Sequence, residues 1–159
     1  MGNERGFNMQ VDIREWEPGL VSGLEVFMVN EVTPTGDYFA WRPSGLAAEF
    51  ADSKISGGMV EACCKNPEYT KVEYHSDYEV FYFTSGDGVM LFCSLEDGKP
   101  LLETCVMLHV KEGMQLCVAP GKAHFVPISL EKDAPVKAVV VSPEMDTWMV
   151  ELGETVSAK

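Results

Sequence analysis

The stretch Val72–Gly88, VEYHSDYEVFYFTSGDG, carries the strongest structural signal in the chain. In its second half, EVFYFTS at 79–85, the alternate positions are occupied by Glu79, Phe81 and Phe83. Alternation with a period of two places such residues on one face of a β-strand. The Gly-Asp-Gly that follows is typical of a turn. This stretch therefore predicts a half-buried strand that ends at residue 85 and carries one carboxylate on its apolar face.

Similar short runs extend from this strand in both directions. They are rich in Val, Phe, Tyr and Leu, and turns that contain Gly, Asp or Pro separate them. We predict strands at about residues 59–64, 70–75, 79–85, 88–95, 101–110, 114–118, 124–129, 136–142 and 147–152. No long amphipathic helix pattern interrupts them, and we expect only one helical turn, at 45–52. Short strands at such even spacing predict an all-β fold with one antiparallel β-barrel or jelly roll.

The first third of the chain has a different character. Turn signals occur at 33–37, 42–45 and 56–58, and the apolar run at 23–29 is the one segment there that predicts a strand. We expect residues 1–58 to form an N-terminal arm with turn-rich strands that packs on a barrel built from residues 59–159. A chain of 159 residues fits a single structural domain.

Composition and charge exclude several classes of function. The chain has 25 acidic and 12 basic residues, which gives a formal net charge of −13. Such a charge argues against nucleic acid and against an anionic membrane surface as partners, because both select for basic faces. No apolar run is long enough for a transmembrane helix, and MGNERGFNMQ at the N-terminus lacks the apolar core of a signal peptide. The five cysteines form no CxxC pair, so we expect reduced thiols and a cytoplasmic protein.

Two of the three histidines are candidates for a metal site. Glu73 and His75 are two residues apart on one predicted strand, so their side chains share a face. Glu79 begins the next strand and can return to the same interior, and His124 follows a tight turn at 120–121. Two imidazoles and one or two carboxylates can hold divalent Mn, Fe, Ni or Zn with positions left open. We take His75, Glu79 and His124 as ligands and Glu73 as a fourth or supporting group; the alternative is that both histidines are structural.

The spacing of these residues resembles the two motifs of the cupin superfamily, which are small β-barrels with a site in the barrel mouth. His75, Glu79 and Gly86 match the second half of the first motif, in which Glu73 takes the place of the first histidine. Gly113, Gly121 and His124 match the second motif. Ala119 stands at the proline position of that motif, and Ile128 stands at its terminal asparagine. This resemblance covers about residues 70–142 and implies a cupin-type barrel and a homodimer.

Within that superfamily the chain looks most like the ureidoglycolate lyase family. The features are the Gly36-Asp37 turn, Glu73-x-His75 before a Phe-rich strand, the Asp-Gly-Lys-Pro hairpin at 97–100, and a Gly-Met-Gln segment at 113–115 that leads to His124. The family typically has a histidine pair near the last position, where this chain has a phenylalanine after His124. The resemblance implies release of urea from ureidoglycolate to give glyoxylate, without a nucleotide cofactor.

Such a reaction needs a proton carrier and an anchor for a small anionic metabolite. We expect Glu73 or Glu79 to move the proton, because an apolar barrel raises the pKa of a carboxyl group. We expect Arg42 and Lys122 to bind the substrate carboxylate, and of these only Arg42 can form a bidentate contact. Two other functions stay open: a different metal-dependent cupin enzyme, such as a sugar isomerase or an iron dioxygenase, and a cupin that binds a ligand without catalysis.

Overall fold

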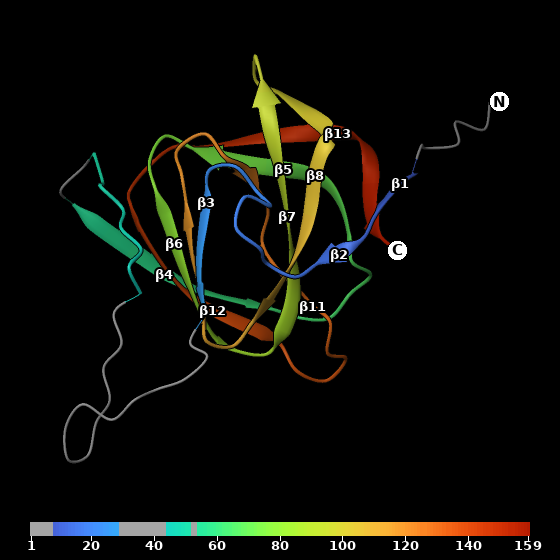
Figure 1. Cartoon of the computed structure of the whole chain (residues 1–159), viewed down its shortest axis with the longest axis horizontal. Coiled ribbons are helices and arrows are strands. Elements are labelled where there is room, and N and C mark those ends of the chain that lie inside the picture. The colour runs from blue at the N-terminus through green and yellow to red at the C-terminus, as the bar shows by residue number, and fades with distance from the viewer. Residues whose placement is uncertain (1–7, 29–43, 52–53) are drawn as a thin grey trace.

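The computed structural model describes residues 8–28, 44–51 and 54–159, and Figure 1 shows that the ordered elements in these ranges are strands. The thirteen strands are β1 (Asn8–Val11), β2 (Ile13–Arg14), β3 (Leu24–Met28), β4 (Ile55–Ala62), β5 (Glu68–His75), β6 (Glu79–Ser85), β7 (Asp87–Glu96), β8 (Lys99–Lys111), β9 (Met114–Val118), β10 (Ala123–His124), β11 (Ile128–Ser129), β12 (Val136–Pro143) and β13 (Thr147–Ala158). No helix within the described ranges could cross a membrane.

The strands form two sheets between which the chain repeatedly crosses. The larger sheet has the order β1-β13-β5-β10-β7-β8-β2, with β11 also paired to β7, and the smaller has the order β3-β9-β6-β12-β4. Consecutive segments such as β5, β6 and β7 lie in alternate sheets, so most pairings join strands distant in sequence (Figure 1). Two sheets linked in this way form a jelly-roll barrel. The predicted all-β jelly-roll barrel is confirmed.

The main core lies between the two sheets. The smaller sheet contributes Phe81, Phe83 and Leu116, and the larger sheet contributes Met90 and Phe92 from β7. Phe81 and Phe83 are buried while Tyr82 between them is 42% exposed, so the alternation at 79–85 has the predicted sense. The sequence pattern thus identified which face of β6 packs against the main core.

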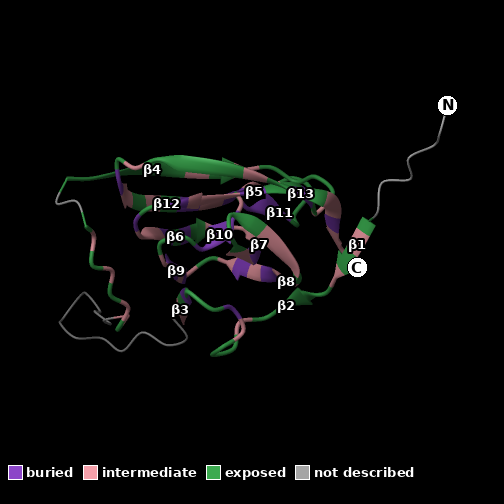
Figure 2. Ribbon diagram, turned by 90° about the horizontal axis from the view of Figure 1, so that it is seen from above, coloured by how far each residue is buried: buried purple, intermediate pink, exposed green. Residues whose placement is uncertain are grey.

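A second core occupies the opposite face of the larger sheet, which curls around it. It includes Val72 of β5, Leu91 of β7, Met107 of β8 and Val156 of β13. The two edge strands of this sheet, β1 and β2, are separated in the chain only by Asp12. The sheet is therefore nearly closed on itself, and β7 is buried on both faces, as the purple central strands of Figure 2 show.

Three local predictions differ from the structure. The described residues 44–51 contain no helical turn. Residues 56–58 form part of β4 rather than a turn: Gly57 adopts φ 143°, and a Cβ there would lie 2.0 Å from the Val140 carbonyl oxygen. The strand predicted at 124–129 divides into β10 and β11, because Pro127 lies between them and has no N–H to donate. The turn signal at 33–37 and most of that at 42–45 lie outside the described residues.

Two glycines with similar backbones allow the packing at the β6–β7 turn to be tested. Gly86 (φ 83°) and Gly113 (φ 85°) are both in the left-handed region, but only at Gly86 would a Cβ meet backbone, 2.6 Å from the Pro135 carbonyl oxygen. Gly113→Ala should cost about 1–2 kcal/mol of unfolding free energy from the φ value alone. Gly86→Ala should cost more, because the Pro135 backbone must also shift. Urea denaturation measures both, and equal losses would contradict the close approach.

Candidate metal centre

Three side chains from three strands converge at one end of the barrel. His75 is the last residue of β5, Glu79 is the first residue of β6, and His124 lies in β10. The Glu79 Oε2 atom is 2.8 Å from Nε2 of His124 and 3.3 Å from Nε2 of His75. All three are well buried, with exposed side-chain fractions of 14% for Glu79, 8% for His75 and 1% for His124. The structure therefore brings together the three residues that the sequence nominated.

The strands leave little freedom in this arrangement. His124 pairs with Glu73 of β5 and with Phe92 of β7, so β10 is held between two strands of the larger sheet. The ring of Phe92 stacks on His124 with centroids 6.1 Å apart, and Phe81 packs against it edge-on at 6.0 Å. These two rings belong to the main core. The imidazole is thus oriented by core packing as well as by its backbone.

The Nδ1 atoms of His75 and His124 lie on the side of each ring away from Glu79, and their hydrogen bonds determine whether Nδ1 carries a proton. Nδ1 of His124 is 3.0 Å from the Lys122 carbonyl oxygen, which can only accept, so Nδ1 carries the proton. Nδ1 of His75 is 3.4 Å from the Asp146 carbonyl oxygen and 3.2 Å from the Thr147 hydroxyl. The carbonyl again favours a proton on Nδ1. Nε2 of each ring therefore faces Glu79, with a lone pair when the imidazole is neutral and with a second N–H, which the carboxylate accepts, when the ring is protonated.

This donor set requires a cation. Burial raises the pKa of Glu79, but the hydrogen bond from His124 and the contact with His75 outweigh burial and lower that pKa to about 2. Burial lowers the pKa of His75, yet the Glu79 carboxylate and the charge of Glu73 raise it overall. An ionised carboxylate facing two lone pairs is stable only when a proton or a metal ion lies among them.

A metal ion fits the residues present. Among described side chains, His75 Nε2 is the buried polar atom without a hydrogen bond, because its contact with Glu79 lacks hydrogen-bond geometry. Ligand atoms of Glu73, His75 and His124 also lie within 4.8 Å of one another, so Glu73 is close enough to be a further ligand. Imidazoles whose Nδ1 protons are held by carbonyl groups are the usual form of histidine ligands. The set of nitrogen and carboxylate donors suits Mn, Fe, Ni or Zn.

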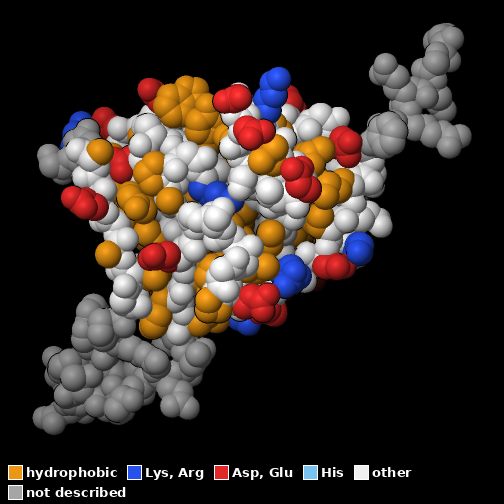
Figure 3. Space-filling model, turned by 45° about the horizontal axis from the view of Figure 1, so that its top comes forward, with side chains coloured by type: hydrophobic (Ala, Val, Ile, Leu, Met, Phe, Trp, Pro, Cys, Tyr) orange, Lys and Arg blue, Asp and Glu red, His pale blue; other side chains and the backbone are white. Residues whose placement is uncertain are grey.

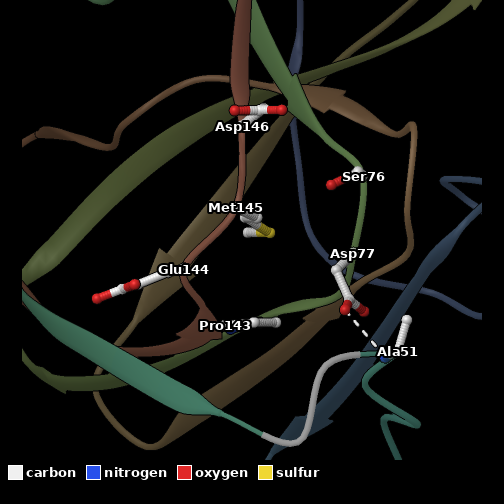
Figure 4. Close-up of a pocket in the computed structure, with 7 residues that line it drawn as sticks. All are labelled: Ala51, Ser76, Asp77, Pro143, Glu144, Met145 and Asp146. Carbon is white, nitrogen blue, oxygen red and sulfur yellow. Dashed lines mark hydrogen bonds between the residues drawn. The ribbon is translucent and has the colours of Figure 1, made fainter.

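Two adjoining clefts lead to this group. The inner one, about 280 Å³, is lined by His75 and Glu79 and by Ser142, Glu144 and Thr147 among others. The outer one, about 820 Å³, shares Pro143, Glu144 and Met145 with it and adds Ser76, Asp77 and Asp146. Figure 4 shows that residues 143–146 form one wall of the outer cleft and Ser76 and Asp77 the facing wall.

The described walls of these clefts carry carboxylates and no Lys or Arg side chain. Asp77 is engaged in structure, since its Oδ2 accepts a hydrogen bond of 2.9 Å from the Ala51 backbone N–H, drawn dashed in Figure 4. Glu144 forms an exposed ion pair with Lys54 at 3.3 Å. Acidic side chains also outnumber basic ones on the face in Figure 3. The lining of the clefts therefore offers an anionic ligand little positive charge beyond His75 and the Lys54 ammonium at Glu144.

The other nominated residues lie elsewhere. Lys122 is 8% exposed, and its Nζ donates to the hydroxyls of Ser94 (3.2 Å) and Ser22 (3.5 Å); it is not among the residues that line either cleft. Arg42 lies outside the described residues. His109 of β8 bridges the carboxylates of Glu15 and Asp87, away from both clefts.

No sequence pattern pointed to the segment 144–147, which connects β12 to the start of β13. Its contributions are the Asp146 carbonyl and the Thr147 hydroxyl at His75 and the cleft wall at Glu144. A backbone carbonyl leaves no side-chain signal in a sequence. The one available signal was Pro143 at the end of a β-run, which predicts a turn but not its position beside β5.

Among known proteins, similarity to this chain was found in solved structures. No protein-family model matches the chain, and no curated protein matches its sequence. Among solved structures, RmlC from Streptococcus suis in complex with dTDP-D-xylose is similar at 15% identity and a TM-score of 0.49, over 85% of this chain and 71% of that one. Bacillus subtilis oxalate decarboxylase, which has Mn(II) centres, is similar at 16% identity and a TM-score of 0.44, over 62% of this chain. Coconut cocosin is similar at 14% identity and a TM-score of 0.44. The chain spans only 24% of the length of the decarboxylase.

The two pKa shifts predict a bell-shaped pH dependence for the metal-free protein. The lowered pKa of Glu79 gives stability that is present above about pH 4.5 and is lost as pH falls toward 2, at most about 3 kcal/mol. The raised pKa of His75 gives stability that is present below about pH 6.5 and is lost as pH rises through its folded value. The difference in unfolding free energy between wild type and Glu79→Gln should therefore be largest between these limits. Denaturation in chelator from pH 2.5 to 9 measures it, and a constant difference would contradict the assignment.

Proposed function

We propose that this protein is a divalent-metal-dependent enzyme that acts on a small molecule in the barrel mouth. The observation that carries the proposal is the convergence of two buried imidazole Nε2 atoms on one ionised carboxylate, with an open cleft beside them. His75, Glu79 and His124 would hold the ion, and Glu73 is near enough to join them.

The bound ion would act as a Lewis acid on a substrate carboxylate, hydroxyl or carbonyl oxygen. The protein contributes orientation, because the Phe81 and Phe92 rings and two backbone carbonyls hold the imidazoles. The carboxylate that does not hold the ion can move a proton. Glu73 suits this role better than Glu79, because Glu79 lies between both imidazoles.

The specific reaction that we propose is C–N cleavage of ureidoglycolate to glyoxylate and urea, which rests on the resemblance of the sequence to that lyase family. A base removes the proton of the substrate hydroxyl as the C–N bond breaks, and the departing urea nitrogen gains a proton. Glu73 would serve in both transfers. Substrate carboxylate would bind the metal, with Arg42 as a second anchor; Lys122 is a weaker candidate, because its Nζ is already bound to Ser94 and Ser22.

We further propose that the protein is a cytoplasmic homodimer. The homodimer rests on the resemblance to cupins. The cytoplasmic setting is supported by the cysteines, all five of which are free thiols.

A sugar isomerase is the second candidate, and the cleft walls favour it. Asp77, Glu144 and Asp146 surround the outer cleft, and these carboxylates repel an anion but can hydrogen-bond to the hydroxyls of a neutral sugar. Carboxylate and imidazole groups beside a metal ion can also move the proton that interconverts an aldose and a ketose. The charge of the preferred substrate therefore separates the two reactions.

Metal content tests the centre directly. The freshly purified protein should contain near-stoichiometric Mn, Fe, Ni or Zn, and His124→Gln should lose it with a melting temperature within a few degrees of wild type when both are metal-free. His109→Gln is the matched control, because His109 binds carboxylates away from the clefts and its loss should leave metal content unchanged. Metal affinity should rise with pH, since the ion displaces a proton. Absence of metal after incubation with all four ions would overturn the proposal.

Activity tests separate the reactions. The metal-loaded protein should release glyoxylate from ureidoglycolate, and Glu73→Gln should reduce kcat by about 100-fold or more, as expected for loss of a general acid–base group. KM should change less, and bound metal should be retained. Turnover of aldoses with no release of glyoxylate would favour the isomerase. No turnover of either class by a protein that binds metal would favour a binding protein.

A further inference from the structure

The antiparallel pairing of β7 and β8 contains one interruption, and two cysteines lie at it. The register is regular as far as Phe92 opposite Val106, and it resumes with Ser94 opposite Leu101. Residues 102–105 of β8 are therefore opposed by Cys93 alone. The Thr104 hydroxyl bridges this bulge, since it accepts from the Ser94 N–H at 2.8 Å and donates to the Leu101 carbonyl at 2.6 Å. These two hydrogen bonds thus fix the conformation of the bulge.

One residue beyond the last regular pair, a continued register would oppose Cys93 to Cys105, and the shift in register begins at this step. Both side chains belong to the second core, Cys93 within it and Cys105 packed against it. The contact between the two thiols lowers the pKa of Cys93 and raises the pKa of Cys105. Directly opposed residues of antiparallel strands have Cα atoms about 4.5–5.5 Å apart, which lies within the range of about 4.4–6.8 Å that a disulfide requires. A bond between the two sulfur atoms therefore needs no change in strand pairing.

The surroundings favour one shared negative charge on this pair. The hydrogen bond from Cys105 lowers the pKa of Cys93 more than burial raises it, and the Lys122 ammonium lowers it further. The bond to Cys93 and burial raise the pKa of Cys105. Lys122 neighbours Ala123, the cross-strand partner of Cys93, and no described carboxylate forms an ion pair with it. A buried ammonium group held only by hydroxyls is stabilised by a nearby thiolate.

We propose that Cys93 and Cys105 form a reversible, peroxide-sensitive disulfide across β7 and β8, a modification site independent of the proposed metal centre. The thiolate of Cys93 attacks one peroxide oxygen, the O–O bond breaks, and the hydroxide that leaves takes up a proton. The Cys105 sulfur then attacks the Cys93 sulfenic acid, and its OH group leaves as water with the Cys105 proton. Two thiols and one hydrogen peroxide thus give one disulfide and two waters. Peroxide enters past Cys105, which is only partly buried, whereas Cys93 is fully buried.

Neighbouring thiols provide the controls. Cys63 and Cys64 are exposed and would form bonds between molecules, so the experiment uses a Cys63→Ser/Cys64→Ser protein. Cys117 stays as an internal reference. It is also buried, but burial raises its pKa, and its Sγ is directed to the Ala47 carbonyl oxygen at 3.6 Å. Site reactivity therefore predicts oxidation of Cys93 and Cys105 together, with Cys117 left as a free thiol.

The measurement is peptide mapping by mass spectrometry after brief treatment of the folded protein with hydrogen peroxide. We expect a mass loss of about 2 Da, a single linked peptide pair that contains Cys93 and Cys105, and full reversal by dithiothreitol. In Cys105→Ser we expect no linked pair and a sulfenic acid on Cys93 that dimedone traps. The proposal is overturned if Cys93 and Cys105 remain free in the folded protein under conditions that oxidise them once it is unfolded. Metal content of the same samples reports separately on the metal centre.

Discussion

The barrel mouth is organised by one electrostatic constraint: a buried carboxylate lies against two imidazole nitrogens whose protons are committed elsewhere. The Lys122 and Asp146 carbonyls fix the Nδ1 protons, so the Nε2 atoms can offer Glu79 only lone pairs unless an imidazole takes a second proton. Neither histidine can turn away, because each ring is enclosed by strands and, at His124, by two phenylalanines. Charge balance at this point is therefore imposed by the fold and must be met by a cation.

The fold maintains this constraint because strands lie behind the site and connecting segments lie in front of it. Behind His124 stands β7, which is buried on both faces and belongs to both cores. In front lie the connections at 76–78 and 144–146, which form the cleft walls. Rigid strands position the ligands, and connecting segments decide what reaches them. The same strand β7 carries Cys93 directly after Phe92, so the thiol pair lies one residue from a ring that packs on His124.

Sequence pattern anticipated the strands and the proximity of His75, Glu79 and His124 for identifiable reasons. Alternation at 79–85 reports directly which side chains face the core, and the spacing of His75 and Glu79 across a short connection brings both to one interior. Prediction was wrong where glycine or backbone groups decide the outcome. Gly57 extends β4 through a segment that looks like a turn, because glycine alone tolerates the approach of Val140. Lys122 has the charge of an anion anchor. The direction of its side chain depends on the pairing of β10 with β7, which local sequence does not encode.

The near closure of the larger sheet has a consequence for the order of folding. β1 pairs in parallel with β13, joining Asn8 to Thr155 and Val11 to Ala158, while β2 pairs with β8. Contacts between such distant segments require closure of very long loops, which slows folding. β1 can pair with β13 only after residues 147–158 have been made, so the docking of β1 comes late in folding. Until that step, the edge of β13 beside the second core is unpaired. An incompletely folded chain would expose this edge to other molecules.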